Sequence, residues 1–402
     1  MTLDMVWATL GSASALVSLP GSVELLVLTA GAALPVRRMP VRGNFSTYKL
    51  AVVIPAHNEE LQIASTVQSV LHARLDGIQL TTVVIADNCT DSTAARAEAA
   101  GARTLVRFND QQRGKGYALD YSFQILMPEG YDGFLIVDAD TEVAKEAIQE
   151  VVRALENGAD AVQCRYLVRN PGASARTRLM SVALMAFNVL RPRGRYRWGL
   201  SAGINGNGFA LSAATLRAVP YGAASLVEDL EYHLDLVRAG RRVWFADGAE
   251  VRGDMPASGK GVSTQRTRWE GGRFRMLAER APLLAVEVLR GRFRLLEPLG
   301  DLVLLPLAFH STLLLAACAF PFGPSRAIGL AGVAVLVLHL IVAVFVGRGG
   351  WAEVAALATA PFYVAWKLML LPAVLASSRA KTAWVRTERS GEKQSDGKGK
   401  SA

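Results

Sequence analysis

Residues 134–140 read FLIVDAD, an apolar run that ends in two aspartates separated by one residue. Such a run is typical of a buried strand that delivers polar side chains at its carboxyl end. Two similar runs come earlier, AVVIP at 51–55 and TTVVIA at 81–86. Between residues 48 and 244 these runs alternate with helical stretches, which predicts βαβ units around a mainly parallel α/β sheet.

The composition indicates contact with lipid. The chain has 402 residues, is 51% hydrophobic and carries 44 Lys+Arg against 35 Asp+Glu, a net charge of +9. This charge suits nucleic acid, an anionic membrane surface or a phosphate-bearing substrate. Because the basic residues cluster beside apolar segments, we expect no nucleic-acid partner. Cys89, Cys164 and Cys318 show no paired spacing, so we expect reduced thiols and neither a disulfide framework nor a structural zinc site.

Residues 6–34 are almost entirely apolar or small, interrupted by Pro20 and Glu24. About 20 such residues suffice to span a bilayer. The basic residues that follow this stretch place the N-terminus outside and the next domain in the cytoplasm, by the positive-inside rule. The sequence therefore predicts a multi-pass protein of the inner cell membrane.

Two apolar stretches near the C-terminus, Leu299–Phe320 and Ala327–Val346, are each long enough to span and predict a hairpin joined at Pro321–Pro324. A third, Trp351–Ala376, contains prolines and a lysine and precedes a basic tail. If it spanned, the tail would lie outside, against the positive-inside rule, so we favour a re-entrant or interfacial segment.

Two amphipathic stretches, Arg176–Leu190 and Thr264–Leu289, mix apolar side chains with arginines. Interfacial helices have this composition, and ordinary core helices are the alternative. The predicted organisation is therefore an N-terminal span with a basic linker at 1–47, a cytoplasmic domain at 48–260, interfacial helices at 261–298, membrane helices at 299–377, and a basic, partly disordered tail at 378–402.

Asp138 and Asp140, two residues apart in an extended chain, can reach one hard cation. Mg²⁺ or Mn²⁺ held there would bridge a diphosphate and neutralise a leaving group. The alternative is that Asp140 caps a helix beginning near Glu142. Lys115, in the flexible basic stretch Arg113–Gly116, is positioned to approach phosphate, but the stretch does not match the Walker pattern and solvated loop charge is the default interpretation.

Polar clusters follow other strands too. Asp87 ends the second run and can accept from a base or ribose hydroxyl, while the residues after it also suit helix capping. Glu228 and Asp229 begin a helical pattern, where acids are common because of the helix dipole. The functional interpretation makes Asp229 the base that deprotonates an acceptor hydroxyl.

Gln265, Arg268 and Trp269 are spaced i, i+3 and i+4 and so share one helical face. An arginine can bind phosphate and a tryptophan can stack on a sugar. An interfacial Arg/Trp anchor is the alternative interpretation.

Taken in order, Asp87, the DAD of 138–140, the ED of 228–229 and the QRTRW of 265–269, after a strand ending in PAHNEE, resemble membrane-bound family 2 glycosyltransferases such as cellulose, hyaluronan and chitin-oligosaccharide synthases. The resemblance covers about residues 50–275 with the flanking membrane segments. It implies a GT-A type catalytic domain and a metal-dependent, inverting transfer from a UDP-sugar.

The resemblance also assigns roles to residues. It implies a catalytic pair of Asp229 and Glu228, a metal held by Asp138 and Asp140, and an acceptor site that includes a small-residue loop at 201–211. The donor-binding residues that it implies are Pro55, Ala56, Asn58, Glu59, Asp87, Lys115, Asp138, Gln265 and Arg268, and the acceptor-binding residues are Trp269, Asn207 and Gly208.

The acceptor is left open between two classes. A growing β-linked glycan would make an exopolysaccharide, but three or four membrane helices are fewer than cellulose synthases carry, so export would need a homo-oligomer or a partner. A membrane lipid such as a ceramide, hopanoid or diacylglycerol suits the small number of spans. A non-catalytic nucleotide-binding scaffold is the third hypothesis.

Overall fold

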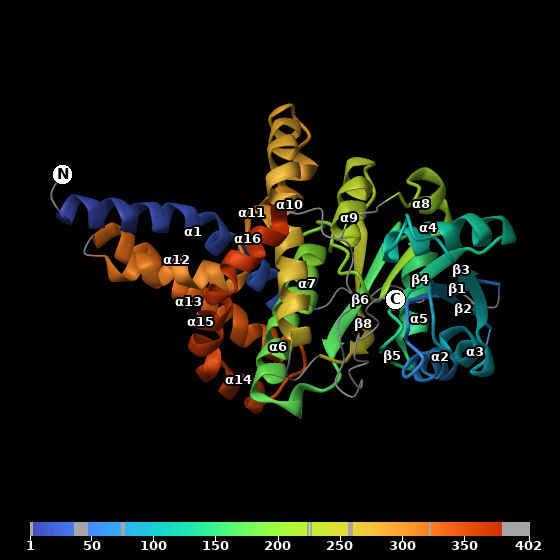
Figure 1. Ribbon diagram of the computed structural model, residues 1–402. Helices are drawn as coiled ribbons and strands as arrows, with labels where there is room; N and C mark the ends of the chain where they lie inside the picture. Colours follow the sequence, from blue (N-terminus) through green and yellow to red (C-terminus); the bar gives the residue numbers. More distant parts are fainter. Residues whose placement is uncertain are drawn as a thin grey trace, which may run out of the picture.

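An eight-stranded mixed sheet in the order β3-β2-β1-β4-β7-β6-β8-β5 forms the centre of the α/β domain (Figure 1). The computed structural model describes residues 3–35, 47–73, 77–222, 225, 227–255, 260–320 and 323–379. The strands are β1 (Lys49–Ala56), β2 (Gln79–Asp87), β3 (Arg103–Arg107), β4 (Gly133–Ile136), β5 (Thr141–Val143), β6 (Ala161–Val168), β7 (Phe209–Ser212) and β8 (Val243–Gly253).

The first half of the sheet is parallel, as the βαβ pattern predicts. β1 pairs in parallel with both β2 and β4, and β2 pairs with β3. The second half departs from the prediction, because β7 is antiparallel to β4 and β6, and β5 is antiparallel to β8. The strands predicted at 51–55, 81–86 and 133–137 are present as β1, β2 and β4, each shifted by at most two residues at either end.

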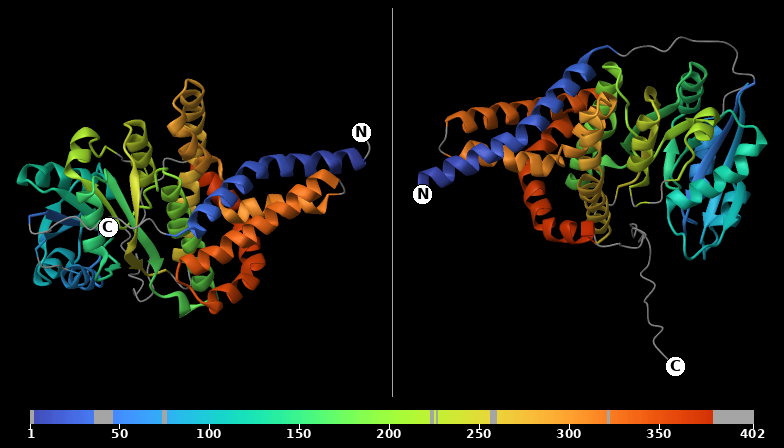
Figure 2. Two further views of the ribbon diagram at one scale, coloured as in Figure 1. Left: turned by 180° about the vertical axis from the view of Figure 1, so that it is seen from behind. Right: turned by 90° about the horizontal axis from the view of Figure 1, so that it is seen from above.

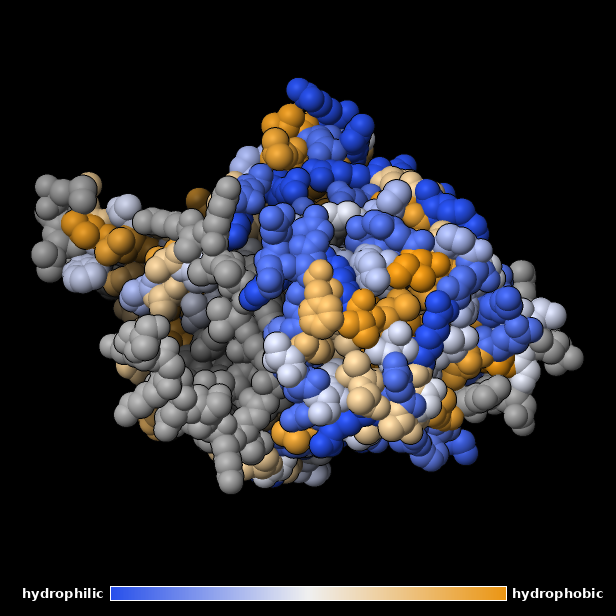
Figure 3. Space-filling view, turned by 45° about the vertical axis from the view of Figure 1, so that its right-hand side comes forward, coloured by the Kyte–Doolittle hydropathy of each residue, from blue (hydrophilic) through white to orange (hydrophobic). Residues whose placement is uncertain are grey.

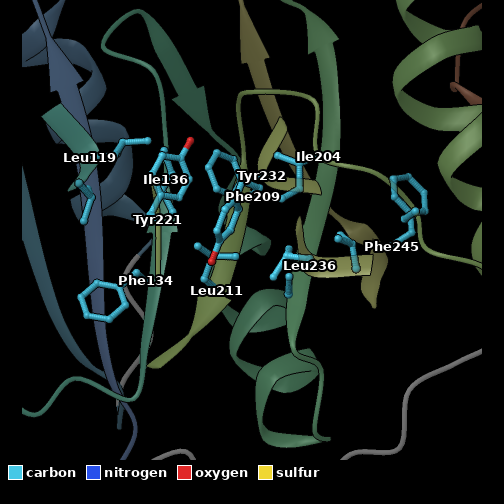
Figure 4. Packing of buried hydrophobic residues seen from close by; sticks show 14 of the residues in the cluster. Leu119, Phe134, Ile136, Ile204, Phe209, Leu211, Tyr221, Tyr232, Leu236 and Phe245 are labelled. Carbon is cyan, nitrogen blue, oxygen red and sulfur yellow. The ribbon is translucent and has the colours of Figure 1, made fainter. Parts of the chain in front are cut away.

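Helices cover both faces of this sheet because side chains alternate along each strand. On one face, Leu50, Val52 and Ile54 of β1 pack with apolar side chains of α2, α3 and α5. On the other face, Ala51 and Val53 belong to a core that includes α4 and α9, and Figure 4 shows its aromatic centre. The helices are α2 (Ile63–His72), α3 (Thr93–Ala99), α4 (Lys115–Leu126), α5 (Ala147–Glu156), α8 (Ala213–Ala218) and α9 (Glu228–Arg238).

An α-helical arm extends from the sheet, with α1, α12 and α13 running side by side (Figures 1 and 2). α1 (Leu3–Ala33) and α13 (Gly323–Val346) are long and apolar enough to cross a membrane. Large apolar side chains on this arm face outward, for example Leu16 at 71% and Leu330 at 58% exposure. The face of the α/β domain seen in Figure 3 is mostly hydrophilic with small hydrophobic patches.

The predicted span at Leu299–Phe320 is not one helix. It consists of α11 (Leu296–Val303) and α12 (Leu307–Ala319), bent by 77° at the break. Pro306 lies in this break, and proline cannot donate the backbone hydrogen bond that a continuous helix needs. The first segment of the predicted hairpin is therefore a bent pair of helices, while α13 matches the second segment.

The last apolar stretch is also broken. The helical segment Trp351–Met369, which includes α14 (Trp351–Ala356) and α15 (Ala360–Met369), meets α16 (Leu371–Arg379) at a bend of 48°. If each bent pair formed one span, the described helices would provide up to four. A bent segment is compatible with the re-entrant path expected here, which remains a prediction.

The two amphipathic stretches join the sheet to the arm. α6 (Ala175–Met185) begins at a capping box between Ser174 and Thr177, continues through a π-helical turn at Ala186–Leu190 and leads into α7 (Arg191–Arg197). α10 (Lys260–Leu289) packs against α11 and α16. Both stretches are helical as predicted, and their placement at a membrane surface remains a prediction.

Candidate active site

A cavity of about 1850 Å³ opens at the carboxyl ends of β1, β2 and β4. In open α/β sheets this edge is where ligands bind. Ten of the predicted site residues line the cavity, although they come from six separate stretches of sequence. They are Pro55, Ala56, Glu59, Asp87, Lys115, Asp138, Asp140, Glu228, Asp229 and Trp269.

Lys115 connects the aspartate after β4 to the loop that follows α7. Its ammonium group donates to a carboxylate oxygen of Asp138 and to the backbone carbonyl of Gly206. Burial is the largest influence on Lys115 and acts to lower its pKa, but the negative charges of Asp138, Glu228 and Asp229 together outweigh burial and raise that pKa, so the side chain is a cation. A fixed positive charge therefore lies beside Asp138, where a diphosphate would need it.

Asp87, at the end of β2, is held from two sides. Arg107 donates to its carboxylate at 2.6 Å, and Asn88 donates to the same oxygen at 3.2 Å. Its backbone carbonyl lies 2.8 Å from Nδ1 of His57. The Asp87 carboxylate is thus oriented by its neighbours. It lines the cavity and can still accept further hydrogen bonds from a ligand.

Glu228 and Asp229 begin α9 and line the same cavity. The Leu230 N–H donates to Oδ1 of Asp229 at 2.8 Å, which leaves Oδ2 on the side of Gly206. Desolvation raises the pKa of Asp229, and the negative charge of Asp138 adds to this, while the Leu230 N–H and Lys115 oppose it. Desolvation and the adjacent Asp229 charge likewise raise the pKa of Glu228.

The raised pKa of Asp229 predicts the pH dependence of turnover. If Asp229 is the general base, it must be ionised, so activity is present above its pKa and is lost as pH falls through it. Because that pKa lies above the ordinary range of aspartate, we expect the acidic limb of the kcat profile at a higher pH than a free carboxyl group would give. A profile measured at saturating donor, with protein stability checked at each pH, tests this; an acidic limb at or below the ordinary aspartate range would contradict it.

Asn207 and Gly208 do not line the cavity, which differs from their predicted contact with an acceptor. Asn207 is 1% exposed and lies behind Asp138, whose backbone N–H donates to its Oδ1 at 3.0 Å. Its amide also donates to Thr141 at 2.8 Å. Gly208 has φ 64°, and a Cβ there would lie 2.5 Å from a methyl group of Val251, so its backbone conformation and packing require glycine.

Asn207→Ala should therefore act through Asp138. The change leaves the Asp138 N–H and the Thr141 hydroxyl without their partner, and we expect the free energy of unfolding to fall by about 2 kcal/mol. We also expect weaker UDP binding, because Asp138 loses its support. Thermal unfolding and UDP titration measure both effects. Asn157→Ala, on a surface turn after α5, is the control, and equal effects of the two variants would contradict this role.

The structure also bears on the predicted donor contact of Asn58 and on the alternative role of Asp140 as a helix cap. Asn58 adopts φ 55°, does not line the cavity and accepts from the Thr90 backbone N–H at 2.8 Å, so it shapes the turn after β1. Residues 141–143 form β5 and α5 begins only at Ala147, so the alternative that Asp140 caps a helix near Glu142 is wrong.

The helix α10 carries the predicted glutamine, arginine and tryptophan. The side chains of Gln265 and Arg268 lie outside the part of the chain that the structure describes, whereas Trp269 lines the cavity and packs against the cluster around Met180. Gly272 follows closely, and a Cβ there would lie 2.6 Å from Val227, the residue before Glu228. A small residue thus allows α10 to approach the start of α9.

The cavity continues past the polar residues into the helical arm. Its apolar lining comes from α12, α13 and α15, and includes Leu307, Leu315, Leu336, Leu340 and Val364. The sequence did not predict this extension, nor the lining residues Arg191 and His233, whereas His57, Arg113 and Asn205 lie in stretches that the sequence analysis had singled out. Nothing in a linear pattern marks the extension, Arg191 or His233, because the helices that meet here are far apart in the chain.

The acidic residues fit a hard divalent cation in part. Asp138 and Asp140 offer carboxylate oxygens, the ligand type that Mg²⁺ and Mn²⁺ prefer. Among the described residues no group of three or more His, Cys, Asp or Glu side chains is placed to hold a metal ion. The remaining ligands would therefore have to come from a bound diphosphate and water.

Comparison with known proteins identifies the family. The family model described as "Glycosyltransferase like family 2" matches residues 48–272, more than half of the chain. A probable glycosyltransferase, YdaM, from Bacillus subtilis (strain 168) is 27% identical over 233 residues, 56% of this chain and 55% of that protein. A 4,4'-diaponeurosporenoate glycosyltransferase from Staphylococcus aureus (strain bovine RF122 / ET3-1) is 30% identical over 150 residues, 35% of this chain and 39% of that protein.

These alignments span about half, or less, of the curated relatives' length. A solved structure, the mannosyltransferase PcManGT from Pyrobaculum calidifontis in complex with GDP-Man and Mn²⁺, shares the fold with a TM-score of 0.54 at 17% identity, over 89% of this chain and 98% of that one. The fold is thus of the GT-A type, as the resemblance implied. The chain belongs to glycosyltransferase family 2.

Proposed function

We propose that this protein transfers a hexose or N-acetylhexosamine from a UDP-sugar to a hydroxyl group of a membrane lipid, with inversion to a β-linkage, at the cytoplasmic face of the inner membrane. The observation that carries the lipid acceptor is the single cavity that runs from Asp138 and Asp229 to the apolar side chains of α12 and α13. Apolar walls favour an acyl or isoprenoid chain, because burying a polar glycan against them leaves its hydroxyl groups without partners.

The donor would lie along the sheet edge. Asp87 would accept from the nucleoside, and the Lys115 ammonium would neutralise the diphosphate. Asp138 and Asp140 would hold a divalent cation whose charge stabilises the departing diphosphate. Glu228, next to the base, would remain partly protonated because its pKa is raised, and so it would add less negative charge near the diphosphate.

The transfer would be one displacement. Asp229 would take the proton from the acceptor hydroxyl as that oxygen forms a bond to the anomeric carbon. The bond from the anomeric carbon to the diphosphate oxygen would break at the same time, and UDP would leave with the electron pair. A single displacement inverts the anomeric configuration, and Asp229 ends protonated.

A growing polysaccharide is the hypothesis that the sequence resemblance favours. The lipid hypothesis fits the cavity better, since the apolar branch of the cavity, which is the extension lined by α12, α13 and α15, has apolar walls. The described helices also offer at most four spans. A membrane lipid can also enter from the bilayer without an export channel. The two hypotheses share the donor site and differ only in the acceptor.

The test is a transfer assay with full-length protein in detergent. Radiolabelled UDP-glucose, UDP-galactose, UDP-N-acetylglucosamine and GDP-mannose are each incubated with a membrane lipid extract, and the products are partitioned between organic solvent and water. We expect label from a UDP-sugar in the organic phase, at the mass of a lipid plus one sugar. Label in a polymer would contradict the lipid acceptor. An absence of transfer from every donor would contradict the proposal that the protein is a sugar transferase.

A further inference from the structure

One buried arginine in the cavity lacks an acidic partner. Four arginines of the described part are nearly inaccessible to solvent: Arg107, Arg165, Arg191 and Arg195. Arg107 pairs with Asp87, Arg165 with Asp247, and Arg195 with Glu297 at 2.5 Å. The side chain of Arg191, a residue at 3% exposure, makes no hydrogen bond or ion pair with any described residue, and its Nε is buried without a partner.

The acids nearest to Arg191 are engaged elsewhere. Asp301 binds Arg195 and Arg273, and Glu24 lies 3.5 Å from Arg195. These carboxylates lie beyond ion-pair distance from Arg191, and their negative charges only raise its pKa. Within the described residues its single close partner is the ring of Phe187, 5.3 Å from the guanidinium carbon. Burial lowers the pKa of Arg191 to about 10, so the side chain is still a cation at neutral pH.

A buried and unpaired cation is costly, and proteins pair such groups with an anion. Arg191 begins α7 and lines the cavity. The preceding residue, Leu190, belongs to the core against which Leu307 and Leu340 of the apolar branch are packed. The free cation therefore lies beside the part of the cavity that would receive a lipid chain.

We infer that Arg191 binds an anionic group of the acceptor, so that the acceptor is a lipid with a phosphate or carboxylate next to the hydroxyl that is glycosylated. This inference rests on the proposed function and names its substrate class. A guanidinium suits either anion, because its donors match two oxygens of one group. The anion stays separate from the reacting hydroxyl, which keeps the role of Asp229 as the base.

The test compares two lipids that differ in the phosphate. Dioctanoyl phosphatidylglycerol and dioctanoylglycerol both carry acyl tails and a free hydroxyl, and their binding to the full chain in detergent is measured by calorimetry without donor. We expect the phospholipid to bind about 10- to 100-fold more tightly, as a charge-assisted hydrogen bond would give. Arg191→Gln should remove this difference, and Arg191→Lys should retain part of it.

The control is Arg197→Gln, on the same helix but away from the cavity lining, which should keep the full difference. Glycerol 3-phosphate, which has the anion but no tails, should bind weakly. Tight binding of glycerol 3-phosphate, an unchanged lipid difference in Arg191→Gln, or an equal loss of UDP affinity in that variant would each overturn the inference. Since binding is measured without turnover, a failure here is distinct from an absence of sugar transfer.

Discussion

Asp229→Asn should lower kcat by at least about 100-fold and leave the affinity for UDP unchanged. The amide is close in size to the carboxylate, so the fold and the donor site are kept, but it cannot take a proton from the acceptor. General-base catalysis contributes about 10²- to 10⁴-fold, and the loss affects only the transition state. Single-turnover transfer and UDP titration of the purified variant measure the two quantities.

The matched control is Asp235→Asn on the same helix. Asp235 lies near Arg238 and its side chain is 48% exposed, so this change removes one acid from α9 without touching the cavity lining. We expect Asp235→Asn to retain full turnover. If Asp229→Asn lost UDP affinity and turnover to the same extent, Asp229 would be a donor-binding residue and not the base.

Removal of divalent metal should have the second large effect. Lys115 balances one charge of the donor site, whereas a diphosphate brings two or more negative charges beside Asp138 and Asp140. We therefore expect excess EDTA to abolish transfer and Mn²⁺ or Mg²⁺ to restore it. The control for effects of the chelator itself is an assay with EDTA that has been saturated with Ca²⁺ beforehand, in the presence of excess Mg²⁺. Activity that survives exhaustive chelation would remove the metal from the mechanism.

The parallel half of the fold could be predicted because it is local. The apolar runs of β1, β2 and β4 are short, end at polar residues and alternate with helices, and these signals do not depend on distant partners. The antiparallel insertion of β7 between β4 and β6 carries no such signal. Its four residues follow a loop rich in glycine and asparagine, and only the pairing with β4 fixes their direction.

The membrane segments show a second limit of sequence. Hydropathy measured along Leu299–Phe320 averages over the break, so a bent pair and a straight span have the same score. Pro306 was the local signal for the bend. The direction of the bend places Leu307 in the cavity, and that placement depends on packing against α13 and the sheet domain.

Some site residues could be predicted from the sequence and others depend on tertiary packing. The acids were predictable because strand ends and helix starts place carboxylates at a sheet edge, and the structure brings them together around one cavity. Their chemical roles remain predictions. Asn207 was assigned to the acceptor because the family resemblance implies an acceptor loop at 201–211, but its amide oxygen accepts from the Asp138 backbone N–H. Arg191 stands among four arginines in RPRGRYR, and no sequence pattern reveals which of them lines the cavity without an ion pair.

The most direct test of the account is an experimental structure of the full chain in lipid nanodiscs with UDP and Mn²⁺. We predict the uracil near Asp87, the diphosphate between Lys115 and Asp138, and a lipid chain in the branch between α12 and α13 with its head group toward Arg191. UDP bound away from this sheet edge, or a glycan chain occupying the apolar branch, would contradict the claim that one cavity joins a nucleotide-sugar site to a membrane lipid.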